Sequence, residues 1–401
     1  MTFKTHLSFI SVRLLVGLLW VSLLLCTSCR RETNNSEKIL VPTAQSIANN
    51  QGTKLQINHA VGFDLDIYDG YAILQIKQYH NDTSDLQTYI LLNHDVTLPS
   101  NLLGFQTIQV PISNVVLLQT AYSAYFKFCD ATSSILGIAD SKYVFDKNLN
   151  KKIEQGIIQE IGSPEQLNIE LITKLNPEIV IGTGFPNIPN KNAVLLERLG
   201  IPTLLFSDWM ETELLGRAEW VKLISILTGR EALAAKKFQI IENKYKLLCQ
   251  TASLANNKPL IMYNMPYKGT WYMPGGYSYI ANTLKDAHGS YTWHDDTHTG
   301  GIQLDFETVF VTGLKADIWI NPGLATSLRD ITGVDSRLAS FRPVQQSLVY
   351  NNNKRTNQKG ANDYWESGLV NPHIILADLI AIIHPELLPE HDLFYYQKLV
   401  N

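Results

Sequence analysis

The spacing of apolar residues changes along the chain and separates regions of different structure. From residue 55 to residue 98, apolar and polar side chains alternate, and Asp69-Gly70 lies between the runs Phe63 to Tyr68 and Tyr71 to Ile76. Alternation with a period of two is typical of half-buried strands, and Asp-Gly is a frequent hairpin turn. A further run from Gln87 to Leu92 predicts another strand. We therefore expect a small antiparallel sheet here.

Beyond Pro111 the pattern becomes one of short apolar runs separated by longer helical stretches. It predicts buried strands at 115–118, from 138 onward, at 179–181 and at 203–206, and a helix at 125–136. This alternation of strand and helix indicates an α/β fold. Helical periodicity also runs through 215–227 and 230–252, with a break at Thr228-Gly229. The second helix would span roughly 35 Å at ~1.5 Å per residue and act as a stiff connection.

A short unit occurs twice on the two sides of that connection. Asn168-Ile-Glu170 opens a helical stretch before the apolar run 177–181, and Asp305-Phe-Glu307 opens one before 316–320. Asn and Asp are good N-cap residues, and a glutamate in the first turn interacts favourably with the helix dipole. The repeat predicts two similar lobes, each with one acidic residue at an equivalent place, as for docking on a two-fold partner.

The first residues have the pattern of a secretory signal. Basic residues precede the apolar run 14–25, the box Cys26-Thr-Ser-Cys29 follows, and a polar stretch begins at Arg30. This pattern predicts a signal peptide over 1–28 and a tether over 29–54, with Cys29 as a lipidated N-terminus like that of bacterial lipoproteins. Cys26 stands where such boxes usually have an aliphatic residue, so simple secretion or an uncleaved anchor are the alternatives.

Charge and reactive residues exclude some function classes. Without the signal peptide the chain has 31 basic and 37 acidic residues, which argues against a nucleic-acid surface. Cys129 and Cys249 lie on different predicted elements and are expected to be separate buried thiols.

No nucleophile elbow, zinc-protease helix or phosphate loop is present in the sequence, so we do not expect an enzyme. A metal site at His288, His294 and His298 is a minority hypothesis, since the surrounding loop is ordinary polar sequence.

Several segments in order resemble the periplasmic substrate-binding proteins of the ferric-siderophore and vitamin B12 class, which supply ATP-driven (ABC) importers. Late segments resemble the branch typical of Bacteroidetes lipoproteins. The matching segments are 115–120, 136–138, 168–181, 199–203, 268–276, 305–307 and 321–323, and for the branch 350–353, 363–368 and 384–388. The resemblance implies two Rossmann-like lobes joined by a long rigid helix. The expected parts are a β extension at 55–110, an N-lobe at 111–228, the linker helix at 229–255 and a C-lobe at 256–401.

The resemblance also implies partners and location. Glu170 and Glu307 match the glutamates that pair with arginines of an ABC permease dimer, which works with separate ATPase subunits. The ligand would be an iron complex or a corrinoid, and no cofactor of the protein's own is expected. We expect a monomer in the periplasm, anchored by lipid to the inner or outer membrane. The alternative ligands are haem and a bare metal ion. The alternative role is that of a surface lipoprotein that passes ligand to an outer-membrane receptor.

The ligand is expected between the lobes, on loops at the carboxyl ends of strands. Aromatic rings with a few cations suit a large conjugated or anionic ligand. The predicted ligand residues are Thr120, Tyr122, Phe185 and Trp209 in the first lobe, and Lys268, Trp271, Tyr272, Trp293, Arg329, Arg355 and Trp365 in the second.

Overall fold

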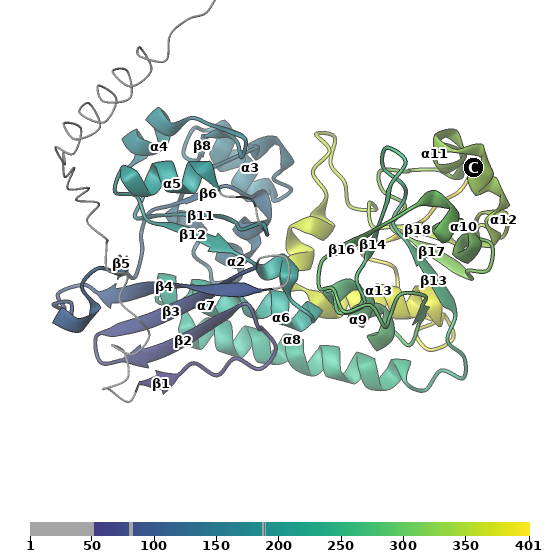
Figure 1. The fold of residues 1–401 in the computed structure, drawn as a ribbon, viewed down its shortest axis with the longest axis horizontal. Helices are drawn as coiled ribbons and strands as arrows, with labels where there is room; N and C mark the ends of the chain where they lie inside the picture. Colours follow the sequence, from purple (N-terminus) through teal and green to yellow (C-terminus); the bar gives the residue numbers. More distant parts are fainter. Residues whose placement is uncertain (1–51, 80–82, 187, 189) are drawn as a thin grey trace, which may run out of the picture. The chain divides into compact units, whose positions relative to one another are not determined.

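The computed structural model describes residues 52–79, 83–186, 188 and 190–401 (Figure 1). All of them fall within one compact unit of the chain, residues 42–401. The predicted signal peptide, the lipidated Cys29 and most of the predicted tether lie outside the described residues. Within these residues, no single helix is long and apolar enough to cross a membrane. The bent pair Asp363–Val370 and Pro372–Ile383 passes that test together, by length and composition only.

A five-stranded sheet forms the N-terminal extension. Its strands are β1 (Thr53–Lys54), β2 (Phe63–Tyr68), β3 (Tyr71–Tyr79), β4 (Ser84–Asn93) and β5 (Gln106–Val110), in the order β1-β2-β3-β4-β5. The predicted hairpin is confirmed, and Gly70 at its turn has a φ of +81°. The expectation of a wholly antiparallel sheet is wrong, because β5 runs parallel to β4. The intervening residues cross one face, where Leu102 of a 3-10 turn (Ser100–Leu102) is buried.

A parallel sheet forms the core of the first lobe. Its strands are β6 (Val115–Leu117), β7 (Ile135–Ile138), β8 (Gln159–Glu160), β11 (Ile179–Thr183) and β12 (Thr203–Phe206), in the order β12-β11-β6-β7-β8. The lobe also contains the helices α2 (Ser123–Phe128), α3 (Lys147–Glu154), α4 (Ile169–Leu175) and α5 (Lys191–Arg198) and the short strands β9 (Gly162–Ser163) and β10 (Gln166–Leu167).

One helix prediction in this lobe is wrong at its carboxyl end. The stretch 125–136 was expected to be helical throughout, but α2 ends at Phe128. Asp130 has a left-handed backbone with a φ of +53°, which stops the helix, and Ile135 pairs with Val115 in the sheet. The strand expected from residue 138 therefore begins earlier, at Ile135.

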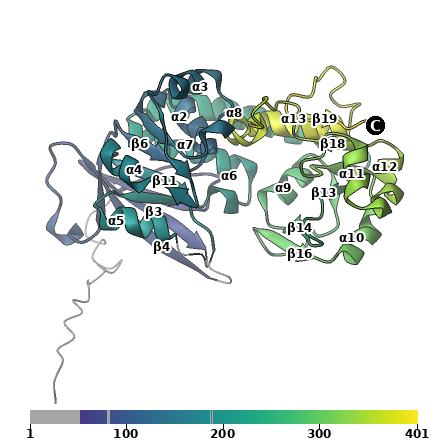
Figure 2. The ribbon, with the colours of Figure 1, turned by 90° about the horizontal axis from the view of Figure 1, so that it is seen from above.

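Helices α6 (Leu214–Glu219) and α7 (Val221–Thr228) end the first lobe, and α8 (Glu231–Ala252) connects it to the second. Gly229 ends α7 with a φ of +64°, a left-handed conformation that favours glycine, so the predicted break is confirmed. The 22 residues of α8 span roughly 33 Å at ~1.5 Å per residue. This helix packs against α7 of the first lobe and against α13 (Pro372–Ile383) of the second (Figures 1 and 2).

The second lobe repeats the α/β plan. Strands β13 (Leu260–Tyr263), β15 (Ser290–Tyr291), β17 (Ile318–Ile320) and β18 (Val349–Asn351) are parallel, and β19 (Gln397–Lys398) is antiparallel, in the order β15-β13-β17-β18-β19. A separate ribbon pairs β14 (Trp271–Pro274) with β16 (Gly301–Leu304). The remaining helices are α9 (Tyr279–Asp286), α10 (Phe306–Gly313), α11 (Leu328–Val334) and α12 (Arg342–Gln345).

The repeated unit has the predicted structure in both lobes. The side-chain Oδ1 of Asn168 accepts a hydrogen bond from the Leu171 N–H at 3.0 Å, and an Asp305 carboxylate oxygen accepts one from the Thr308 N–H at 2.6 Å. The strands that follow, β11 and β17, are buried. Glu170 and Glu307 lie exposed in the first turns of α4 and α10.

Candidate ligand site

The loops after β11 and β12 carry a pair of aromatic rings, of which Phe185 is exposed and Trp209 is partly buried. Phe185 is 52% exposed, and its ring centroid lies 5.7 Å from that of Trp209. The indole N–H of Trp209 donates to the Gly184 carbonyl oxygen at 2.9 Å, which joins the two loops. Because the strands are parallel, both loops are at the same edge of the sheet. The structure therefore brings these two predicted ligand residues together.

The second lobe approaches this pair closely. A methyl group placed on Gly300, just before β16, would lie 3.9 Å from the Trp209 ring. Thr299 Oγ1 is 4.0 Å from the sulfur of Met210. A ligand that binds next to Trp209 is therefore within reach of both lobes.

Tyr122 is buried beneath this edge of the sheet and does not contribute to its surface. Its side chain is only 3% exposed, and its hydroxyl lies 2.6 Å from Thr183 Oγ1 and donates to the Asp208 carboxylate at 3.2 Å. Burial and the charge of Asp208 raise the pKa of Tyr122 well above its ordinary value, so the phenol stays protonated. Thr120 lies partly buried in the adjoining 3-10 turn Thr120–Tyr122.

Sequence reasoning missed Arg217, which lies where the lobes meet. Its guanidinium is 3.1 Å from the Asp208 carboxylate and 4.5 Å from the ring centre of Tyr279 in the second lobe. The Tyr279 N–H also donates to the Glu211 carbonyl oxygen at 3.2 Å. Arg217 belongs to a stretch with ordinary helical periodicity, so no local signal distinguishes it from other helix residues.

The prediction for Trp271 is corrected by its burial. The indole has no exposed surface, it packs against Phe306, Trp319 and Phe341, and its N–H donates to the Tyr263 carbonyl oxygen at 3.1 Å. A ring enclosed in this way is part of the core of the second lobe, and we remove it from the candidate site.

The neighbours of Trp271 are accessible. Tyr272, on the opposite face of β14, is 43% exposed. Lys268 is exposed in the preceding loop, and its ammonium lies 5.2 Å from the Tyr267 ring centre. Both side chains remain candidates for ligand contacts, one as a ring surface and the other as a cation.

The remaining predicted residues of the second lobe differ in exposure. Trp293 is half-buried and packs edge-on against Tyr291, whereas Trp365 is 50% exposed. Arg329 lies on α11, which is on the side of the second lobe remote from the first in both views (Figures 1 and 2), so we remove it from the site.

Arg355 is already paired. Its guanidinium lies 2.6 Å from the Asp363 carboxylate and over the rings of Phe394 and, in the first lobe, Phe145. The same segment makes a second contact with the first lobe, because the Glu366 carboxylate accepts hydrogen bonds from the Phe145 and Asp146 N–H groups. The role of Arg355 in the structure is therefore a contact between lobes.

The comparisons with known proteins agree with this architecture. Residues 115–331 match the family model "Periplasmic binding protein", which covers more than half of the chain. The chain belongs to this family of binding proteins.

Similar proteins extend the match over most of this binding protein. An uncharacterized lipoprotein of Methanocaldococcus jannaschii is 25% identical over 390 residues, covering 91% of this chain and 90% of the relative. Among solved structures, the periplasmic haem-binding protein RhuT of Roseiflexus sp. has a TM-score of 0.54 at 16% identity, covering 69% of this chain and 99% of its own. FeuA of Bacillus subtilis, a triscatecholate siderophore binding protein solved with ferri-bacillibactin, has a TM-score of 0.51 at 15% identity, covering 78% and 99%. These neighbours confirm the two-lobed α/β fold.

The histidines of this binding protein pair locally. His294 Nε2 lies 3.2 Å from Asp295, and His298 Nδ1 lies 3.0 Å from Asp296. His288 packs near His384, with ring centroids 5.9 Å apart. In the part of the chain that the structure describes, no cluster of three or more His, Cys, Asp or Glu residues could hold a metal ion.

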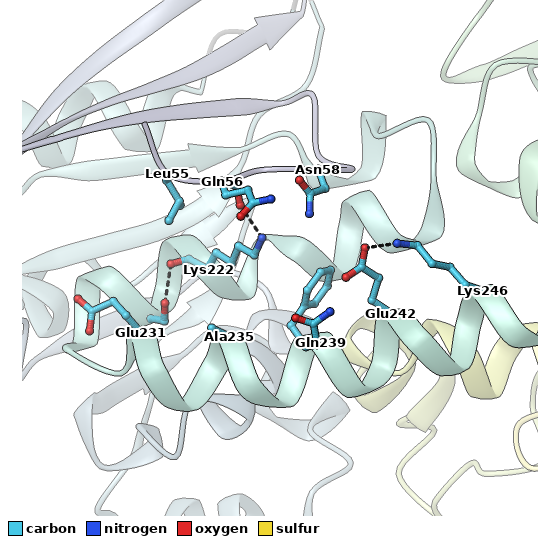
Figure 3. Close-up of a pocket in the computed structure, with 11 residues that line it drawn as sticks. Leu55, Gln56, Asn58, Lys222, Glu231, Ala235, Gln239, Glu242 and Lys246 are labelled. Carbon is cyan, nitrogen blue, oxygen red and sulfur yellow. Dashed lines mark hydrogen bonds and ion pairs between the residues drawn. The ribbon is translucent and has the colours of Figure 1, made fainter. Parts of the chain in front are cut away.

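A cavity of about 430 Å³ lies away from the aromatic pair, between residues 55–58, α7 and α8 (Figure 3). Both of its lysines are paired, since the Lys222 ammonium is 2.6 Å from the Gln56 carbonyl oxygen and the Lys246 ammonium is 2.6 Å from Glu242. The cavity lies between the extension and the connecting helices, and it offers no unpaired cation to an anionic ligand.

Proposed function

We propose that this protein is an extracytoplasmic, lipid-anchored binding protein that captures an iron complex, a ferric siderophore or haem, and delivers it to an ABC permease. The observation that supports the proposal is the partly exposed Phe185–Trp209 pair at the carboxyl ends of β11 and β12, with the second lobe against Trp209. Flat rings at such an edge suit a large conjugated ligand. A corrinoid or a metal ion alone is the alternative cargo.

Membership of the binding-protein family and the kinds of ligand named for its structural neighbours agree with this proposal. RhuT is named as a haem-binding protein, FeuA was solved with a ferric siderophore, and CeuE of Helicobacter pylori, with a TM-score of 0.53 at 18% identity, was solved with Ni(II). The CeuE match covers 74% of this chain and 92% of that chain. These ligands support a metal complex as the class of ligand proposed for this protein.

A titration with separate ligands tests the capture step. Purified residues 30–401 are mixed with haem, a ferric tris-catecholate complex or cobalamin, and tryptophan fluorescence and ligand absorbance are recorded. We expect saturable binding of one ligand and at least tenfold weaker binding in Trp209→Ala and Phe185→Ala. Tyr68→Ala is the matched control, since Tyr68 stacks on Tyr71 within the extension. Absence of saturable binding for all three ligands contradicts the proposal.

The delivery step is assigned to Glu170 and Glu307. Both are exposed in equivalent first turns, and Glu307 has one distant ion pair, with Arg337 at 3.7 Å. Exposed carboxylates of this kind can pair with arginines of a two-fold permease. We expect Glu170→Arg with Glu307→Arg to abolish ligand uptake into proteoliposomes that carry the permease and its ATPase, while binding in solution is unchanged. Glu165→Arg, which changes an exposed residue before α4, should have no effect.

A further inference from the structure

An arm of the second lobe, residues 355–366, reaches the first lobe. Its two sides are joined by Arg355 and Asp363, because the Asp363 N–H donates to the Arg355 carbonyl oxygen at 2.9 Å and the side chains form an ion pair at 2.6 Å. Near its tip, Asn357 Oδ1 accepts the N–H group of Ala361 at 3.0 Å. These bonds lie within the arm, so its shape does not depend on the first lobe.

The arm makes a buried polar contact just before α3 of the first lobe. The Glu366 carboxylate is 5% exposed and accepts the N–H groups of Phe145 at 2.6 Å and Asp146 at 3.0 Å. The Arg355 guanidinium lies 5.4 Å from the centre of the Phe145 ring. Hydrogen bonds that are shielded from water contribute more than exposed ion pairs do. Glu366 is therefore the main attachment of the arm to the first lobe.

A second contact between the lobes lies elsewhere along the ligand edge, the edge of the first-lobe sheet at the carboxyl ends of its strands. It is the approach of residues 299–300 to Trp209 and Met210. In the sheet order β12-β11-β6-β7-β8, Trp209 follows β12 and Phe145 comes after β7, so the loop after β6 lies between the two contacts. The contact at 299–300 is uncharged. The lobes thus touch toward both ends of the ligand edge, and the charged groups are in the arm.

Further contacts join the lobes beside α8. The Tyr245 hydroxyl of α8 donates to the Asp286 carboxylate at the end of α9 at 2.8 Å, and the Tyr279 N–H donates to the Glu211 carbonyl oxygen at 3.2 Å. Figure 1 shows the arm, in yellow-green next to α3, on the side of the lobe junction opposite α8. A small rotation of the lobes about α8 therefore moves the arm furthest from the first lobe and disturbs the contacts beside α8 least.

We propose that the arm is a latch that holds the lobes closed over the ligand site, so that its release from residues 145–146 controls how fast ligand enters and leaves. The proposal rests on the proposed capture function. Ligand reaches Trp209 while the lobes are apart and leaves from the same open state. Weakening the latch raises the open fraction of the free and of the bound protein by the same factor. Association and dissociation then accelerate together, and Kd changes little.

Stopped-flow kinetics test the latch with residues 30–401 and whichever of haem, a ferric tris-catecholate complex or cobalamin the protein binds. We expect Glu366→Ala to raise both rate constants at least fivefold and to leave Kd within about threefold of wild type. Glu366→Gln keeps an acceptor oxygen and should raise them less. Glu165→Ala changes an exposed glutamate before α4 and should have no effect. Unchanged rates in Glu366→Ala, or faster dissociation with unchanged association, overturn the latch.

A covalent tether tests the same step in the opposite direction and does not require Glu366→Ala to fold. The Lys359 ammonium near the tip of the arm is 3.9 Å from the Glu154 carboxylate of α3, and both side chains are exposed. With Cys249→Ser, which removes the partly buried free thiol, the pair Glu154→Cys and Lys359→Cys is joined by a short bis-maleimide. Both rate constants should fall at least tenfold. Each single-cysteine variant treated with the same reagent should match wild type, and equal rates with and without the tether overturn the inference.

Distances between spin labels supply a readout that needs no ligand. Labels are placed at Lys151→Cys on α3 and at Tyr267→Cys in the second lobe, both exposed positions, again with Cys249→Ser. We expect Glu366→Ala to lengthen the mean distance and Glu165→Ala to leave it unchanged. If ligand binds but neither rates nor distances respond to Glu366→Ala, only the latch fails. If none of the three ligands binds, the capture function fails, and an unchanged distance then rejects the latch as well.

Discussion

Glu366 links the two lobes through a buried carboxylate, and its ionisation should control stability near neutral pH. The side chain is 5% exposed and accepts the N–H groups of Phe145 at 2.6 Å and Asp146 at 3.0 Å. Burial raises the pKa of Glu366 to about 7, helped by the nearby charges of Asp146 and Asp363, and the two N–H donors oppose only part of that rise.

The magnitude follows from the difference between the folded and unfolded pKa values. A rise from 4.5 to about 7 corresponds to roughly 3 kcal/mol, at ~1.36 kcal/mol per pKa unit. Because the folded state holds the proton more tightly, this stability is fully present below pH 4.5 and is lost as the pH rises through about 7. Glu366→Gln keeps the shape of the side chain and removes the titration. The free energy of unfolding of wild type, minus that of Glu366→Gln, should therefore fall by roughly 3 kcal/mol between pH 4.5 and pH 8.

Urea unfolding measured by tryptophan fluorescence at several pH values provides the assay. Subtraction of the variant removes the contributions of other titrating groups, including His59, whose pKa is raised by its hydrogen bonds to Glu213 and Glu242 against the opposing effect of burial. Glu165→Gln makes the same chemical change at an exposed glutamate outside the contact between the lobes and serves as the control. A difference for Glu366→Gln that changes by less than about 0.5 kcal/mol over this range would refute the reasoning.

Three further outcomes follow from the structure and the sequence. Trp271→Ala should reduce the free energy of unfolding by about 3 to 5 kcal/mol in urea denaturation, because the ring fills the second-lobe core, whereas Tyr272→Ala should change it by less than about 1 kcal/mol. Gly62→Ala should destabilise the protein by about 1 to 3 kcal/mol by the same measurement, since the new methyl group would lie 2.8 Å from both the Glu211 carboxylate and the Trp220 ring. Cys29→Ala should abolish incorporation of labelled palmitate in cells, and an equal signal in the variant would argue for secretion without lipid.

The parts of the fold that depend on local pattern were predictable from the sequence. Asp69-Gly70 marks a hairpin because few other dipeptides accept that turn, and Gly229 ends α7 because the left-handed backbone there favours glycine. The capped helix and buried strand of the repeat were recognised in both lobes for the same reason. Each of these features is determined by residues within a few positions of one another.

Features that depend on distant residues were not predictable. Trp271 follows a Gly-containing loop and looks like a binding residue, but it is buried by Phe306, Trp319 and Phe341, which are distant in the sequence. The parallel pairing of β5 likewise depends on where residues 94–105 cross the sheet. The contact of Arg217 with Tyr279 was not predictable either, because Arg217 lies in an ordinary helix pattern and Tyr279 is in the other lobe.

The position of the extension decides how its role can be studied. Gln78 and Tyr89 satisfy carbonyl groups on the edge strand β12, and Glu211 and Glu219 are completely buried around the chain that enters the extension. Deleting the extension would remove the N–H donors of residues 58–62 from two buried carboxylates and uncover a sheet edge, and each of these is costly. Loss of binding in such a deletion would therefore report unfolding as readily as a lost ligand contact. Single substitutions at exposed side chains of the extension leave these connections intact, so they separate the two causes.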